Sequence, residues 1–144
     1  MADVSGPAFR CLIPALELDD GQVLTQSLSM IEYLDETHPE PPLLPIDPVD
    51  REYVRALSQI VACDTHPLNN LRVLKLLKKS YGLDQEGINA WYRHWIAEGL
   101  SSLERTLAAP RSQNQKDNKA GKYCFRDQVT MADCCLVPQV FNAK

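Results

Sequence analysis

A proline-rich segment divides this chain into two parts of different character. Residues 38–45 read His-Pro-Glu-Pro-Pro-Leu-Leu-Pro, with four prolines in eight residues. Proline restricts φ and has no backbone N–H, so such a run forms a stiff, extended connector. We therefore expect a first domain over residues 1–38, a linker over 39–47 and a second domain over 48–144.

The part before the connector is predicted to begin with a β-hairpin. Residues 12–18 read as a short strand and residues 22–24 as the returning strand, with Asp20-Gly21 between them. Asp-Gly is a strong signal for a tight turn between two strands.

A helix is predicted directly after the hairpin. Ser27 stands at its start, where the hydroxyl can accept a hydrogen bond from the first turn. Leu28, Ile31 and Leu34 recur at helical spacing, and the helix should end before Pro39. Two strands and one helix cannot form an independent core, so this part needs more chain or another domain to cover it.

The part after the connector is predicted to be helical throughout. Asp47 caps a helix with Pro48 at its first position, and the pattern continues to Gly82. Pro67 should kink or divide this helix. A second long helix should begin near Asp84 and bury a stripe of apolar residues. They are Ile88, Trp91, Trp95, Leu100, Leu103 and Leu107.

The aromatic residues Trp91, Tyr92 and Trp95 are interpreted as core, with an aromatic ligand pocket as the alternative. The polar stretch after Pro110, up to Gly121, reads as an exposed loop. The last helix should begin at Thr130, where Thr130 and Asp133 can cap each other's backbone N–H groups.

Composition excludes several classes of protein. Hydrophobic residues make up 44% of the chain and charged residues 24%, as in globular proteins. The net charge of −4 gives no reason to expect a nucleic acid partner. No apolar run approaches the roughly 20 residues that span a bilayer. The first residues lack the pattern of a signal peptide, so we expect a cytoplasmic protein without membrane association.

The cysteines fit neither a disulfide framework nor a zinc site, because their number is odd and no C-x-x-C occurs. They are Cys11, Cys63, Cys124, Cys134 and Cys135. We interpret them as reduced thiols, in preference to a redox role, and expect no metal site.

Three segments together resemble the zeta class of glutathione transferases. They are Leu12-Ile13-Pro14-Ala15-Leu16-Glu17 continuing to Leu34, His66-Pro67-Leu68-Asn69-Asn70-Leu71-Arg72-Val73-Leu74, and Gly121-Lys122-Tyr123-Cys124 continuing to Val140. The combination is similar to maleylacetoacetate isomerase and maleylpyruvate isomerase. The resemblance implies an α+β protein, in which a partial thioredoxin-like domain precedes an incomplete all-helical C-terminal domain, and it implies a homodimer.

The resemblance also implies a glutathione site in the first domain. The bond between Ile13 and Pro14 would be cis, and the backbone of Ile13 would pair with the cysteinyl unit of glutathione. Gln26 and Ser27 would hold the γ-glutamyl end, which agrees with the attraction of helix N-termini for carboxylates. The alternatives are an ordinary proline at a strand edge and a serine that only caps its helix.

His66, Asn70 and Arg72 form a second implied group, over the cleft of the family. They would contact glutathione or the carboxylates of a small dicarboxylic substrate, for which the fork of Arg72 is suited. A solvent-facing histidine and an arginine in a surface ion pair are the alternatives, and the residues leave both open.

The implied activity is the glutathione-dependent isomerisation of maleylacetoacetate to fumarylacetoacetate, in phenylalanine and tyrosine catabolism. Maleylpyruvate is an alternative substrate, and a non-catalytic dimerisation or interaction module of the same fold is an alternative function. The family's serine-serine-cysteine motif has no match in residues 1–12, so no catalytic residue is assigned. We expect that this chain is truncated at both ends, does not isomerise by itself, and is marginally stable, aggregation-prone or dependent on dimerisation.

Overall fold

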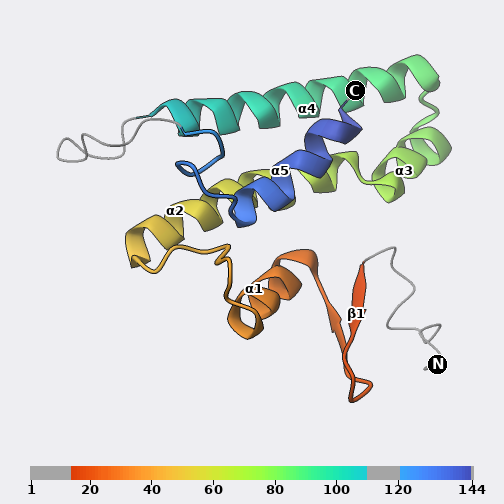
Figure 1. Ribbon diagram of the computed structural model, residues 1–144. Coiled ribbons are helices and arrows are strands. Elements are labelled where there is room, and N and C mark those ends of the chain that lie inside the picture. Colours follow the sequence, from red (N-terminus) through yellow and green to blue (C-terminus); the bar gives the residue numbers. More distant parts are fainter. Residues whose placement is uncertain (1–13, 110–120, 144) are drawn as a thin grey trace. The chain divides into compact units, whose positions relative to one another are not determined.

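The structure is a computed structural model that describes residues 14–109 and 121–143. It divides into two compact units, and the division between Pro42 and Leu43 lies inside the proline-rich segment. The first unit has a small sheet and one helix, and the second has helices (Figure 1). The predicted α+β class is confirmed, whereas the domain limits at residues 38 and 47 remain predictions.

The hairpin of the first unit is present as expected. Strands β1 (Ala15–Glu17) and β2 (Val23–Thr25) pair antiparallel, in a two-stranded sheet. The Leu18 N–H donates to the Gln22 carbonyl at 2.8 Å, and Gly21 has φ +83°. Glycine adopts this conformation without steric cost, which is why the Asp-Gly signal identified the turn. Residues 12 and 13 of the predicted strand lie outside the described residues.

Helix α1 (Ser27–Thr37) corrects the prediction that Ser27 is a helix cap. The N-cap residue is Gln26, with φ 72° and ψ 111°, and it makes no side-chain capping hydrogen bond. Only Gln26 separates the end of β2 from α1, so the chain turns from strand to helix at this residue and Ser27 becomes the first helical position. The end of α1 before Pro39 is confirmed. Leu34, which the prediction places on the apolar face of this helix, is 41% exposed, whereas Met30 beside that face is buried.

The second unit begins with helix α2 (Pro48–Gln59), capped as predicted. Asp47 Oδ1 accepts hydrogen bonds from the N–H groups of Val49 and Asp50, at 3.0 and 2.9 Å. The helix then loses its regular form, through a π-helical turn, a 3-10 turn and a new helix. These are η2 (Ile60–Thr65), η3 (His66–Asn69) and α3 (Leu71–Tyr81). Pro67 lies within the break, as its missing N–H predicts.

Helix α4 (Gln85–Ala108) packs on η2 and η3. Asp84 caps it by accepting from the Gly87 N–H at 2.8 Å. The predicted stripe is only partly buried, because Ile88 and Leu103 are buried while its other members are half-buried. Ile96, which the prediction omitted, is also buried.

Helix α5 (Met131–Asn142) begins at the predicted capping pair. Asp133 Oδ2 accepts from the Thr130 N–H at 2.8 Å, and Oδ1 accepts from the Cys124 N–H at 2.9 Å. Burial alone would raise the pKa of the Asp133 carboxyl, but these hydrogen bonds outweigh burial and hold the pKa below its ordinary value. The helix packs on α2, where Leu57 and Met131 are fully buried.

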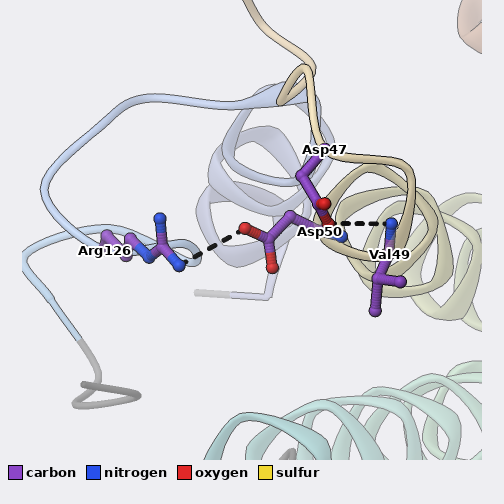
Figure 2. Close-up of polar contacts among 4 residues, drawn as sticks. All are labelled: Asp47, Val49, Asp50 and Arg126. Atoms are coloured by element: carbon purple, nitrogen blue, oxygen red, sulfur yellow. Dashed lines mark hydrogen bonds and ion pairs between the residues drawn. The ribbon is translucent and has the colours of Figure 1, made fainter. Parts of the chain in front are cut away.

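An ion pair joins the loop before α5 to α2. Arg126 Nη2 lies 3.3 Å from Asp50 Oδ2, as Figure 2 shows, and the Asp50 side chain is mostly buried. Arg126 has φ 55°, and its guanidinium lies over the Phe125 ring at 4.7 Å. The Phe125 ring also lies beside Tyr53 of α2, with ring centroids 6.4 Å apart, so the loop contacts α2 through both a charge and an aromatic ring.

We expect Asp133→Asn to lower the free energy of unfolding by about 2–3 kcal/mol, because it weakens hydrogen bonds from two backbone N–H groups to a charged acceptor. Urea denaturation measures the loss. Asp127→Ala is the matched control, since exposed Asp127 accepts one hydrogen bond, from the Lys122 N–H. Equal losses in the two variants would contradict the central role of Asp133.

The difference in the free energy of unfolding between the wild type and Asp133→Asn should depend on pH. Because the pKa of Asp133 is lowered in the folded state, its stabilisation is complete above the ordinary pKa of 3.8 and is lost as the pH falls through the lower folded value. The difference between the wild type and Asp133→Asn should therefore shrink in acid.

We expect Gly99→Ala to destabilise the contact between α4 and η2 by about 1–3 kcal/mol. A Cβ on Gly99 would overlap the hydroxyl oxygen of Thr65 and lie 2.8 Å from the Cβ of Thr65, which is buried. Gly87→Ala, in the same helix, is the control, because its nearest neighbour would be a Leu83 side-chain atom at 3.3 Å. Thermal unfolding of both variants measures the difference. An unchanged midpoint for Gly99→Ala would show that Thr65 moves to accommodate the added methyl group at little cost in free energy.

Candidate functional site

The hairpin register brings the predicted residues of the first unit to one end of the sheet. Ala15 pairs with Thr25, so Pro14 and Gln26 flank the same pair, although they are far apart in the sequence. Pro14, Gln26 and Ser27 are all exposed. Ile13 and the geometry of its bond to Pro14 lie outside the described residues.

The start of α1 is suited to a carboxylate ligand. No side chain of the described residues caps this helix, and its first turn has no acidic residue. The first N–H groups of a helix lack partners within the helix, and the helix dipole adds a partial positive charge. The Ser27 hydroxyl is exposed at the same place and can donate one more hydrogen bond.

The backbone of Gln26 is strained. A residue other than glycine at φ 72° lies in a region of sparse population, at a cost on the order of 1–3 kcal/mol. Such residues are concentrated at functional sites, where the surrounding structure holds them in place. Here the strain places an exposed polar residue between a strand end and an uncapped helix start.

The second predicted group lies at one junction of the second unit. His66 begins η3, and Asn70 is the N-cap residue of α3, whose Oδ1 accepts from the Arg72 N–H at 3.1 Å. The structure thus assigns Asn70 a capping role that the sequence analysis did not consider. His66 and Arg72 are exposed, and no described carboxylate forms an ion pair with Arg72.

Gln139 is a residue of this junction that sequence reasoning missed. Its Oε1 lies 3.2 Å from Nδ1 of His66, although 73 positions separate the two residues. Gln139 belongs to α5 and is 3% exposed. A polar residue inside a largely apolar helix was the only available signal, and that signal does not identify a partner.

The aromatic residues of α4 pack as core. Trp91 Nε1 donates to the Leu68 carbonyl at 2.9 Å, and the Trp91 and Trp95 rings meet edge to face with their centroids 5.7 Å apart. Both side chains are half-buried against their neighbours. This arrangement favours the core interpretation over an aromatic ligand pocket.

The half-buried thiols of Cys124 and Cys135 are poorly suited to nucleophilic chemistry. Burial raises the pKa of Cys124 to about 12, with a further contribution from Asp133, and burial raises the pKa of Cys135 to about 11. Both remain protonated near neutral pH, whereas the thiolate is the reactive form. The described cysteines are free, and the described residues contain no cluster of His, Cys, Asp or Glu suited to a metal ion.

Comparison with known proteins shows similarity to glutathione transferases along most of the chain. Residues 10–42 match the N-terminal domain of glutathione S-transferases. Maleylpyruvate isomerase from a Ralstonia species is 48% identical over 133 residues, which cover 92% of this chain and 59% of that protein. The chain thus spans about three fifths of the length of this relative. Within the part of the chain that the structure describes, no helix is long and apolar enough to cross a membrane.

Solved structures agree with these relatives. The holo structure of a maleylpyruvate isomerase, described as a zeta-class bacterial glutathione S-transferase, has a TM-score of 0.82 at 48% identity, over 92% of this chain and 58% of that one. A maleylacetoacetate isomerase from Methylobacterium extorquens was solved with malonate and glutathione. It has a TM-score of 0.83 at 38% identity, and the match covers 97% of this chain and 64% of that one. Over about nine tenths of its length, the chain is thus similar to zeta-class isomerases of the glutathione transferase family.

Proposed function

We propose that this protein binds glutathione and uses it to convert maleylacetoacetate to fumarylacetoacetate. The observation that carries the proposal is the uncapped start of α1, where Gln26 and Ser27 lie at the same end of the hairpin as Pro14. The names of the similar proteins support the isomerase reaction, and the bound ligands of one of them support a site for glutathione and a dicarboxylate. The proposal includes a homodimer in the cytoplasm.

The described residues fit a glutathione carboxylate. The first N–H groups of α1 and the Ser27 hydroxyl can donate to it, and no acidic side chain in the first turn repels it. When bound, glutathione supplies the thiol that acts as nucleophile. The described residues bind and orient, and none is assigned a catalytic role.

Arg72 is the proposed contact for a substrate carboxylate. Its side chain is exposed, and it forms no ion pair with a described residue, so the surface ion pair considered as an alternative receives no support. A guanidinium binds a carboxylate through two parallel hydrogen bonds, which orients a dicarboxylate better than a single charge does.

A chimera tests the proposed function independently of where the chain begins and ends. Residues 14–143 would replace the matching segment of the Ralstonia maleylpyruvate isomerase, which is 48% identical. We expect the chimera to isomerise maleylacetoacetate only when glutathione is present, and maleylpyruvate serves as the comparison substrate. A folded chimera that binds glutathione without turnover would favour the interaction module, and one that does not bind it would contradict the proposal.

We expect Ser27→Ala to weaken glutathione binding by about 1.5–3 kcal/mol, the value of a hydrogen bond to a charged group. Calorimetry on the same chimera measures the affinity. Ser29→Ala is the matched control, because Ser29 is an exposed serine in the same helical turn. An unchanged affinity in Ser27→Ala would remove this residue from the site.

A further inference from the structure

We propose that the lysine face of α3, which consists of Lys75, Lys78 and Lys79, docks a short acidic and amphipathic segment of a partner protein. This face belongs to a single helix of the second unit, so its role is independent of glutathione. Arg72 of the same helix, the proposed contact for a substrate carboxylate, is not part of the lysine face.

The three lysines share one side of a helix that has no acidic residue. Lys78 and Lys79 follow Lys75 by three and four positions, and side chains at this spacing lie on the same side of a helix. All three are exposed, and none forms an ion pair with a carboxylate of the described residues. Positive charge is thus concentrated at one place on a chain whose net charge is −4.

The elements that pack against α3 do not neutralise this charge. The helix packs on α4 and η3, at one end of the second unit (Figure 1). η3 has no acidic residue, and α4 begins with Asp84, which caps it, and Glu86 in its first turn. Neither carboxylate forms an ion pair with a lysine of the described residues. The lysine face is therefore open to an anionic partner.

The stability of α3 does not account for the cluster. Lys78 and Lys79 lie in the last turn, where cations interact favourably with the helix dipole, but Lys75 lies one turn earlier. Like charges at this spacing also repel one another and destabilise the helix. An arrangement that opposes the stability of its own helix, without a compensating carboxylate in the described residues, points to a partner outside the chain.

Exposed aliphatic side chains adjoin the lysines. Leu71 lies one turn before Lys75 and is 58% exposed, and Leu76 lies one turn before Lys79 and is 52% exposed. A purely ionic partner would leave both leucines in water. An amphipathic segment pairs its carboxylates with the lysines and covers the leucines with its own apolar side chains, which removes that apolar surface from water.

The charge of the whole chain favours a short segment over an extended anionic surface. At physiological ionic strength, exposed charges interact over only about 8 Å. A short peptide therefore meets the lysines alone. A bilayer or a nucleic acid also approaches the rest of the chain, which has 19 Asp and Glu against 15 Lys and Arg in total. An acidic protein segment is thus the occupant that the charges favour.

Fluorescence anisotropy with the full chain tests the docking. The probe is a labelled synthetic peptide with glutamates and leucines at helical spacing, and the reference peptide has glutamine in place of each glutamate. We expect only the acidic peptide to bind. Lys75→Gln, Lys78→Gln and Lys79→Gln together should weaken binding about tenfold, because several exposed ion pairs of modest strength are lost. No binding by the wild type, or equal binding of the two peptides, overturns the proposal.

A matched variant separates the lysine face from net charge. Arg93→Gln, Arg105→Gln and Lys122→Gln together remove the same charge from exposed positions elsewhere in the second unit, and should leave the affinity unchanged. Equal weakening by the two triple variants would indicate a general charge effect and contradict a local site. If the variant of the lysine face does not fold, Lys75→Gln alone should still weaken binding more than Lys122→Gln, and equal affinities again decide against the site.

Two further measurements test the choice of occupant. Leu76→Gln should weaken peptide binding about threefold, because a half-exposed leucine loses its burial. An unchanged affinity would mean that charge alone acts, and would overturn the amphipathic segment. Phosphatidylserine vesicles and single-stranded DNA are the competing partners. Tighter binding to either of them than to the peptide at the same salt concentration, lost in the variant of the lysine face, would assign the face to that partner instead.

Discussion

The second unit depends on the carboxylate of Asp133. Its two oxygens accept hydrogen bonds from the N–H groups of Thr130 and Cys124, and one of them also accepts from the Thr130 hydroxyl. These contacts begin α5 and hold the preceding loop against it. The Met131 N–H donates to the Leu43 carbonyl at 3.0 Å, so the first residues of the unit are attached at the same place. The same helix carries Gln139, whose Oε1 lies 3.2 Å from Nδ1 of His66.

The two groups of candidate residues, one in each unit, lie where regular structure is interrupted. In the first unit, strained Gln26 separates β2 from a helix without a side-chain cap. In the second, the break around Pro67 exposes His66 and begins a new helix at Leu71. Local rules of stability are most often broken at functional sites. One reason is that a helix start whose backbone N–H groups are already hydrogen-bonded has no donor left for a ligand. The interruptions therefore expose the groups for which a binding role is proposed.

Sequence reasoning succeeded for signals that act over a few residues. The Asp-Gly turn, the Asp47 cap and the pair of Thr130 and Asp133 each depend on contacts within four positions. It failed where the outcome depended on neighbouring elements. Ser27 was wrongly expected to cap α1. The chain turns from β2 into the helix at Gln26, so Gln26 takes the N-cap position and Ser27 becomes the first helical residue.

The sequence by itself determined the α+β class and most helix starts, because these are encoded in local chemistry, and a run of matching residues carried the resemblance to glutathione transferases. Only the tertiary structure decided which sides of the helices are buried, as Ile96 and exposed Leu34 illustrate. It also decided that Pro14 lies at the same hairpin end as Gln26, and that Gln139 meets His66. The physical reason is that strand register and helix packing join residues far apart in the chain, and no local pattern encodes such a pairing.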